Sequence, residues 1–277
     1  METSLPAVRP RPVLKWVGGK RRLLPELLSR LPGRFGAYHE PFVGGGALFF
    51  ELRGCGAIGH AILSDINVSL IDVYIGLRDW PQDVIEALRV HRYDRDYFYY
   101  IRSLAPETLT PAERAARIIY LNKTCYNGLY RENRSGQFNA PFGRYDNPVI
   151  CDEANLAAAS QALRGTEITC TRFTSVLAMA RPGDLVYFDP PYHPVSATAH
   201  FTQYDRQGFG ESDQRELCSV FSQLTERGVY ALLSNSDTEL IRRLYADYRK
   251  DIVYAPRVVN SKVTDRGRVA ELLIVNF

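Results

Sequence analysis

Long apolar runs and paired cysteines are both missing from this sequence of 277 residues. No stretch of 18 consecutive apolar residues occurs, so we expect no transmembrane helix and no membrane partner. The five cysteines are scattered, and none forms a C-x-x-C pair, which argues against a disulfide framework or a zinc site. We therefore expect reduced thiols, a cytoplasmic protein and no bound metal.

The net charge is low, at only +3, and lysine is scarce beside arginine, at 5 against 29. The positive charge is concentrated in residues 114–145, where six cations and six aromatic residues accompany a single acid, Glu132. Cations interleaved with aromatic rings are typical of nucleic-acid-binding surfaces. A solvated basic face above core aromatics would account for this window equally well.

Alternating strand and helix patterns cover the first 80 residues and return after residue 165. This alternation predicts an α/β fold with a mostly parallel, three-layered sheet. The intervening sequence favours helices around a Gly/Asn-rich stretch, whose Asn127-Gly128 and Ser135-Gly136 pairs predict a hairpin. We expect a flexible tail at 1–12, a core built from 13–80 and 166–277, and an inserted domain at 81–165.

Three glycines, Gly44–Gly46, stand between a predicted strand and a predicted helix in "EPFVGGGALFFEL". Such a turn lets a ligand approach the backbone beside a helix N-terminus, although a tight turn between strand and helix has the same pattern. The spacing fits neither the dinucleotide fingerprint nor a P-loop. Asp65, about 20 residues on, ends the next strand and can bind ribose hydroxyls or cap a helix. An adenosine ligand without a pyrophosphate, such as S-adenosylmethionine, is favoured.

The segment Asp189-Pro190-Pro191-Tyr192 follows the apolar run Leu185–Phe188. Two prolines make a rigid, extended exit from a strand, so the acid before them is held in a fixed direction. Ligands of open α/β sheets bind at the carboxyl ends of strands, where the glycine turn, Asp65 and Asp189 are all predicted to fall. We expect these residues to face one crevice. The alternative is a turn that only terminates the strand.

Several segments in one order resemble the Dam-type DNA adenine-N6 methyltransferases, and the likeness runs from Leu14 to Leu273. They are "LKWVGGK", "EPFVGGGALFFEL", "ILSDIN", "LNKTCYNGLYRENRSGQFNAPFGRY", "DPPYHPVSATAHFTQY", "LLSNSD" and "ELL". The resemblance implies a Rossmann-like methyltransferase sheet with an inserted, mainly helical DNA-recognition domain. It also implies S-adenosylmethionine as cofactor and double-stranded DNA as partner, with neither a metal nor an obligate protein partner.

In such an enzyme the segment Asp189-Pro190-Pro191-Tyr192 would be catalytic and would receive a flipped-out adenine. The Asp189 carboxylate and the Pro190 carbonyl would accept the two N–H bonds of the N6 amine, which turns its lone pair toward the methyl group. Pro191 would keep these acceptors rigid, and Tyr192 would stack on the base.

Cofactor contacts are implied for the matching positions of the family pattern: Trp16, Lys20, Phe42, Gly44, Gly46, Asp65 and Asp189. Two of them have simpler alternatives. Trp16 could be a core aromatic residue, and Lys20 could cap or solubilise its helix.

DNA contacts are implied for a second set: Lys15, Tyr126, Asn127, Leu129, Arg131, Arg134, Pro141, Arg144 and Tyr145. In this set the family pattern makes Tyr126 a wedge in the duplex, with Asn127 beside the vacated base position. Lys15 matches a guanine contact. The pattern implies GATC, or a longer site containing GAT.

The other members of that set match base-reading or phosphate positions. Leu129, Arg131 and Pro141 match residues that read the target, because arginine suits guanine and apolar atoms suit a thymine methyl. Arg134 and Arg144 are assigned to phosphates, and Tyr145 could serve packing alone. Two alternative functions stay open: N4-cytosine methylation of DNA, and a non-catalytic DNA-binding regulator of the same fold.

Overall fold

The structure, a computed structural model, describes residues 8–133, 135–195, 208–256 and 268–277. The chain forms two compact units. Unit 1 comprises Met1–Gly19, Gly44–Gly59 and Ser64–Cys170, and unit 2 comprises Lys20–Val43, His60–Leu63 and Thr171–Phe277. The functional division into a tail, a catalytic core and an inserted recognition domain stays a prediction.

Seven strands form one sheet in the order β3-β2-β1-β4-β5-β7-β6. β1 pairs in parallel with β2 and β4, and β4 with β5, whereas β7 runs antiparallel to both β5 and β6. This confirms the predicted α/β class with a mostly parallel sheet. The strands are β1 Tyr38–Glu40, β2 Ala61–Asp65, β3 Glu167–Cys170, β4 Leu185–Phe188, β5 Tyr230–Ser236, β6 Arg249–Pro256 and β7 Arg268–Val275.

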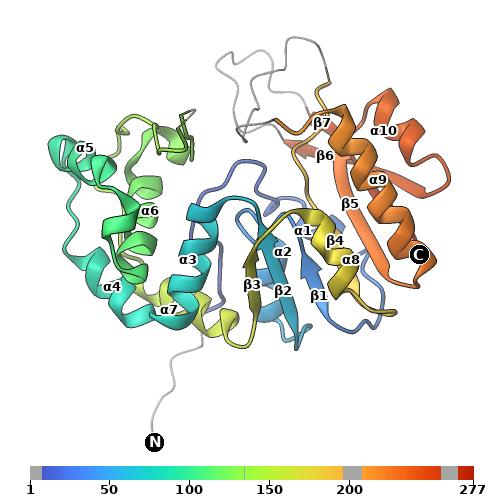
Figure 1. Cartoon of the computed structure of the whole chain (residues 1–277), viewed down its shortest axis with the longest axis horizontal. Coiled ribbons are helices and arrows are strands. Elements are labelled where there is room, and N and C mark those ends of the chain that lie inside the picture. Colours follow the sequence, from blue (N-terminus) through green and yellow to red (C-terminus); the bar gives the residue numbers. More distant parts are fainter. Residues whose placement is uncertain (1–7, 134, 196–207, 257–267) are drawn as a thin grey trace, which may run out of the picture. The chain divides into compact units, whose positions relative to one another are not determined.

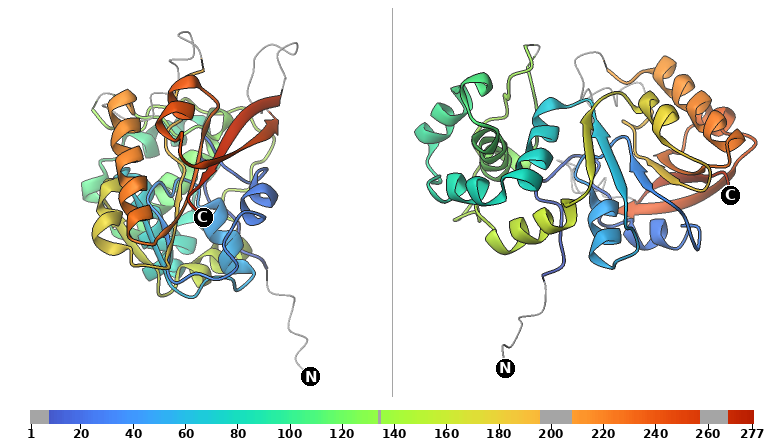
Figure 2. Two further views of the ribbon diagram at one scale, coloured as in Figure 1. Left: turned by 90° about the vertical axis from the view of Figure 1, so that its right-hand side faces the viewer. Right: turned by 60° about the horizontal axis from the view of Figure 1, so that its bottom comes forward.

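The core of unit 2 lies between β4, β5, β7 and helix α9 (Glu211–Glu226). Leu217, Phe221 and Leu224 recur at helical spacing on α9 and are fully buried, so this helix covers the sheet with one apolar stripe. The short helix α1 (Leu24–Leu28) lies on the opposite face of the sheet from α9 (Figure 2, left). Two more helices of unit 2 are α8 (Val176–Met179) and α10 (Glu239–Leu244), and η3 (Phe173–Ser175) is a 3₁₀ turn.

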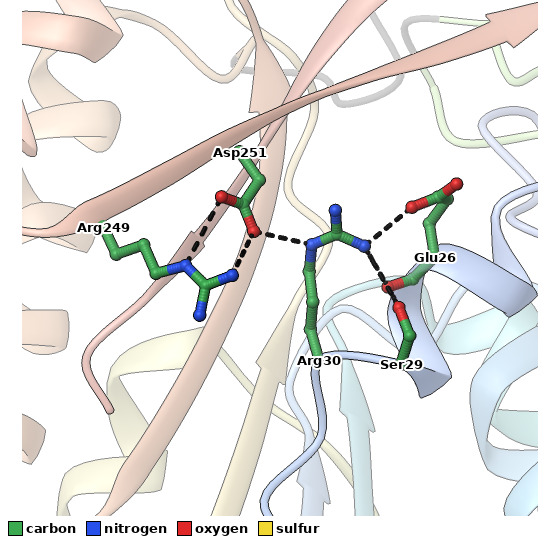
Figure 3. Close-up of polar contacts among 5 residues, drawn as sticks. All are labelled: Glu26, Ser29, Arg30, Arg249 and Asp251. Atoms are coloured by element: carbon green, nitrogen blue, oxygen red, sulfur yellow. Dashed lines mark hydrogen bonds and ion pairs between the residues drawn. The ribbon is translucent and has the colours of Figure 1, made fainter.

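A network of ion pairs connects α1 to β6, the strand at one edge of the sheet. Arg30 Nη1 lies 2.7 Å from Glu26 Oε2, and Arg30 Nε lies 2.8 Å from Asp251 Oδ2 on β6 (Figure 3). Arg249 reaches the same carboxylate oxygen at 3.0 Å. Because the Arg30 side chain is only 18% exposed, its pairs are less screened by water than surface pairs.

Unit 1 is mainly helical, and α6 (Pro111–Thr124) packs against α3, α4 and α5 (Figure 1). Helix α6 begins with a capping box, in which the Thr110 hydroxyl accepts from the Glu113 N–H and the Glu113 carboxylate accepts from the Thr110 N–H. The other helices are α2 Ala47–Gly54, α3 Val68–Asp79, α4 Pro81–Arg89, α5 Arg95–Ser103 and α7 Glu153–Leu163, with 3₁₀ turns η1 Pro106–Thr108 and η2 Tyr126–Gly128.

The Gly/Asn-rich stretch after α6 folds back on itself without regular strands in its described part. Two isolated antiparallel bridges, Cys125↔Phe142 and Glu132↔Phe138, take the place of a continuous hairpin ladder. Asn127 and Gly128 belong to η2, and Asn127 has a φ of 57°. Turn residues therefore mark the reversals of the chain, and backbone bonds such as Tyr126 N–H to the Pro141 carbonyl and Asn139 N–H to the Arg131 carbonyl join its two sides.

Candidate active site and recognition segment

The Asp189 carboxylate stands directly after β4 and pairs with Lys20. Lys20 Nζ lies 2.8 Å from Asp189 Oδ1, and the two side chains are 8% and 18% exposed. Burial raises the pKa of Asp189 from 3.8 to about 6, against the opposing effect of the Lys20 ammonium. The alternative that Lys20 only solubilises or caps its helix is therefore wrong, because its ammonium is buried against an acid.

Two contacts hold the Tyr192 side chain, one at its hydroxyl and one at the face of its ring. Its hydroxyl donates to Glu271 Oε2 at 2.8 Å, and the Lys20 ammonium lies 4.6 Å from the centre of its ring. Burial and the neighbouring Asp189 carboxylate raise the pKa of the Tyr192 phenol well above its ordinary value. A cation over an aromatic face is an attractive contact, so Lys20 links the acid and the ring.

Two buried amides hold the proline pair from behind. Gln214 Nε2 donates to the Pro191 carbonyl at 3.0 Å, and Asn235 Nδ2 donates to Gln214 Oε1 at 2.9 Å. Asn235 Oδ1 also accepts the His193 N–H at 3.1 Å. Both amides are fully buried. The residues after Asp189 are thus held by side chains on α9 and β5.

Gln214, Asn235 and Glu271 were not among the predicted site residues. The sequence carries a signal for Gln214, which stands in the apolar stripe of α9 three residues before Leu217. A polar residue at a core-facing helical position must find a buried partner, and here the partner is the Pro191 carbonyl.

The glycine turn in unit 1 is closely covered by Trp16. Gly44 has a φ of 46°, and a Cβ atom there would lie 2.9 Å from Trp16 Cδ1, so no side chain fits. The Gly44 N–H donates to Asp65 Oδ2 at 3.2 Å, and the Tyr74 hydroxyl donates to the Gly44 carbonyl at 2.9 Å. The structure therefore brings together three residues predicted for the cofactor: Trp16, Gly44 and Asp65.

The predicted capping role of Asp65 falls to another residue. Asn67 is the N-cap of α3, because its side chain accepts from the Leu70 N–H at 2.9 Å. Asp65 instead bonds the Asn67 N–H at 3.0 Å as well as the glycine turn. Trp16 stacks on Tyr130 with ring centres 4.8 Å apart, which gives it a packing contact in addition to any ligand.

The remaining two predicted cofactor residues lie in different surroundings. Gly46 is the N-cap of α2 and has a φ of 65°. Phe42, in unit 2, stacks on Phe173 with ring centres 5.2 Å apart and meets Phe209 edge-on at 5.7 Å.

Four predicted DNA contacts surround one hollow of about 140 Å³. It is lined by Tyr126, Leu129, Arg131, Ala140 and Pro141. The Tyr126 side chain is exposed, as a residue that enters a duplex must be, and it stands beside Asn127. Arg131 is turned toward Asn139, with Nε 2.7 Å from Asn139 Oδ1.

The other predicted DNA residues differ in exposure. Lys15 and Arg144 are exposed. Tyr145 is partly buried, and its hydroxyl donates to the Cys125 carbonyl at 3.0 Å, which fits a packing role. Arg134 lies outside the described residues.

Part of the basic window serves the fold instead of a ligand. Arg117 is buried, and its guanidinium donates to the carbonyls of Ile101 and Arg102 at 2.9 and 2.7 Å. Arg114 pairs with Asp72 at 3.0 Å. The exposed cations of the window, Arg131 and Arg144, lie after α6, and a nucleic-acid-binding role for them stays a prediction.

Comparison with known proteins identifies the family. Residues 16–259 match the D12 class N6 adenine-specific DNA methyltransferase family. The chain belongs to this family. It is 40% identical over 275 residues to the type II methyltransferase M1.LlaDCHI of Lactococcus lactis, covering 96% of this chain and 95% of that protein. It is 35% identical over 267 residues to the DNA adenine methylase of Escherichia coli, covering 95% and 94%.

Membership confirms the predicted enzyme class, a DNA adenine-N6 methyltransferase with a Rossmann-like fold. It sets aside the two alternatives, cytosine methylation and a regulator without activity. Among the described residues, no helix is long and apolar enough to cross a membrane. The same residues contain no group of three or more His, Cys, Asp or Glu side chains placed to hold a metal ion.

Proposed function

We propose that this methyltransferase transfers the methyl group of S-adenosylmethionine to a flipped-out adenine within GATC in duplex DNA. The buried Asp189 carboxylate, fixed by Lys20 and followed by two prolines, is the observation that carries the proposal. The GATC site is supported by the match of the recognition segment to the Dam-type pattern. Relatives named type II methyltransferases share the family, so the site needs its own test.

The Asp189 carboxylate and the Pro190 carbonyl accept the two N–H bonds of adenine N6. These bonds favour a pyramidal nitrogen whose lone pair can attack the methyl carbon. The acceptors lose little freedom during the reaction, because Gln214 holds the next carbonyl, that of Pro191, at 3.0 Å. Tyr192, held by Glu271, offers its ring to the base.

Asp189 can also take the proton that N6 must lose. After transfer the nitrogen carries one proton more than the product, and a carboxylate 18% exposed with a pKa of about 6 can accept it and pass it to water. Lys20 keeps the carboxylate ionised before the reaction, since its ammonium opposes the effect of burial.

The residues around the glycine turn fit an adenosine-containing cofactor. Gly44 lets the indole of Trp16 pack directly on the backbone of the turn, and Asp65 presents a carboxylate at the same turn. Trp16 would stack on an adenine ring, and Asp65 would accept from ribose hydroxyls. S-adenosylmethionine supplies the reaction with an electrophilic methyl group on a sulfonium.

The recognition segment supports base reading by one long cation and several apolar atoms. Arg131 suits a guanine edge, and Leu129 and Pro141 beside the same hollow suit a thymine methyl. Tyr126 is exposed at the rim and can enter the stack that the adenine leaves.

The test is to incubate the purified protein with S-adenosylmethionine and an unmethylated plasmid, and to map modified bases at single-nucleotide resolution. We expect N6-methyladenine in GATC and in no other sequence. Methylation in a different motif would overturn the GATC assignment alone. Absence of any modified adenine, with DNA and cofactor binding both measured, would overturn the assigned roles of Asp189 and Pro190.

A further inference from the structure

Two asparagines of unit 1 hold the N-terminal segment in the same way. Asn155 Oδ1 accepts the Arg11 N–H at 3.0 Å, and its Nδ2 donates to the Arg11 carbonyl at 3.2 Å. Asn122 Oδ1 accepts the Lys15 N–H at 2.8 Å, and its Nδ2 donates to the Lys15 carbonyl at 3.0 Å. We call these contacts the Asn155 clamp and the Asn122 clamp. Each amide replaces the strand partner that would otherwise bond both polar groups of one residue.

The clamps come from two different helices, α6 and α7, and stand four residues apart on the segment. Val13 and Leu14 between them are buried at 5% exposure, whereas Lys15 is exposed. The backbone is thereby fixed on both sides of a short apolar anchor. Only the side chain of Lys15 is left to reach outward from the second clamp.

The Asn122 clamp has a third bond that the Asn155 clamp lacks among the described contacts. Asn122 Nδ2 also donates to the Gly128 carbonyl at 3.1 Å, which ends the turn η2 of the recognition segment. All three bonds require this amide orientation, because a flipped amide would set its NH₂ against the Lys15 N–H. Asn122 is 1% exposed, so each lost bond would leave a buried polar group unpaired.

Lys15 also lies directly over Gly128. A Cβ atom at Gly128 would stand 2.8 Å from Lys15 Cδ and 3.3 Å from Lys15 Cβ. Gly128 has a φ of 64° as well, so both its conformation and the stem of Lys15 require glycine. The direction of the Lys15 side chain is therefore set by the same turn that carries Tyr126 and Asn127.

From this geometry we infer that Asn122 is a specificity-determining positioning residue: it fixes Lys15 against the recognition turn, so that one rigid frame reads the DNA. The inference rests on the proposed function and on the guanine contact that the resemblance to the Dam-type family implies for Lys15. The Asn155 clamp anchors the segment but has no bond to the recognition turn, which makes it the matched control.

The experiment measures kcat/KM at saturating cofactor on the cognate duplex and on duplexes with one base pair changed at each position of the site. Lys15→Ala first identifies the base pair that Lys15 reads. We expect Asn122→Leu to lose discrimination by about tenfold at that base pair and to keep it at the others, because one misplaced base contact is lost. Asn155→Leu should keep discrimination at every position.

A double variant separates positioning from general damage. When Lys15 is already alanine, Asn122→Leu should cause no further loss of discrimination, since the side chain it positions is absent. Additive losses, or equal losses at every base pair, would overturn the inference. If Asn122→Leu does not fold, Asn122→Ala removes the same three bonds with a smaller side chain and should give the same loss at the same base pair.

The outcomes also separate this inference from the proposed function. Unchanged discrimination in Lys15→Ala would overturn the expected guanine contact of Lys15 and this inference with it, and would leave the roles proposed for Asp189 and Pro190 unaffected. A loss of discrimination in Lys15→Ala, together with full discrimination in the Asn122 variants, would overturn the positioning role of Asn122 alone.

Discussion

The proposed catalytic segment, residues 189–192 in unit 2, and the proposed recognition segment, residues 126–141 in unit 1, are held in opposite ways. Asp189 to Tyr192 is short and rigid by its prolines, and buried charges and amides surround it. The stretch from Tyr126 to Pro141 is irregular, with exposed side chains on a backbone pinned by a few bonds. Methyl transfer requires catalytic groups that are shielded from water and held in place. Recognition of DNA bases requires side chains that are exposed to the DNA and start from a fixed backbone position.

Loss of the Asp189 carboxylate should have the largest effect. Asp189→Ala removes an acceptor for the N6 amine, so we expect kcat to fall by about 10³-fold or more while DNA binding is retained. Single-turnover methylation and a gel-shift titration measure the two quantities. Asp251→Asn, a change of another part-buried acid of unit 2, should leave transfer per folded molecule unaltered. Undiminished turnover in Asp189→Ala would show that the Asp189 carboxylate is not needed for methyl transfer, and residues 189–192 would then not be the catalytic segment.

Removal of Arg131 tests the other half of the comparison. We expect Arg131→Ala to reduce discrimination at one base pair by about 1–3 kcal/mol, with kcat on cognate DNA changed much less. Arg144→Ala should instead weaken binding to all sequences and lower the slope of log affinity against log salt by about 1. An equal loss on unrelated DNA would make Arg131 a phosphate contact as well.

Lowering the pH should affect the proposed catalytic segment but not the proposed recognition segment, without any mutation. Because the pKa of Asp189 is raised to about 6, kcat/KM should fall about tenfold per pH unit below that value, while base discrimination stays constant. Because the pKa of Asp189 is higher in the folded protein, the folded state binds a proton at Asp189 more tightly than the unfolded chain does. The resulting contribution to the free energy of unfolding is complete below about pH 4 and is lost as the pH rises through about 6. Activity and this contribution to stability therefore move in opposite directions.

Urea unfolding of wild type and Asp189→Asn across pH 4–7 measures the stability part. Wild type should lose stability relative to the variant as the pH rises, by an amount on the order of 2 kcal/mol. A difference that grows in favour of wild type would mean that Lys20 outweighs burial.

The same contrast explains what the sequence could predict. Strand order along the chain, the glycine turn and the Asp189 segment follow from local patterns, since apolar runs, glycines and prolines fix the backbone directly. The predicted chain reversal is present, but its antiparallel pairing is limited to two isolated bridges, and Asn122 on the preceding helix bonds the Gly128 carbonyl of its first turn. Arg117 was counted as a surface cation, although it serves backbone carbonyls in the interior. Partners that are remote in sequence leave no local signal.

Gln214 and Asn122 show the limit most clearly. Each is a polar residue in the apolar stripe of a helix, and that position indicates a buried partner without naming it. The partner of Gln214 is 23 residues away and that of Asn122 is 107 away, at Lys15. Only the fold brings them together.

The smallest effect expected concerns ion pairs away from both segments. Arg30 is 18% exposed and joins Glu26 and Asp251 within one network (Figure 3). Arg89 and Glu153, in unit 1, are 56% and 49% exposed and form a single pair. We expect Arg30→Ala to lower the free energy of unfolding by about 1–2 kcal/mol, because it leaves Asp251 part-buried with only Arg249 beside it. Arg89→Ala should cause no measurable change, since water already solvates both partners. Chemical denaturation of the two variants under one salt condition compares them directly. Equal losses of unfolding free energy in the two variants would mean that burial does not make the Arg30 pairs stronger than the exposed Arg89 pair. Burial would then matter for the charges around Asp189 but not for this ion-pair network of unit 2.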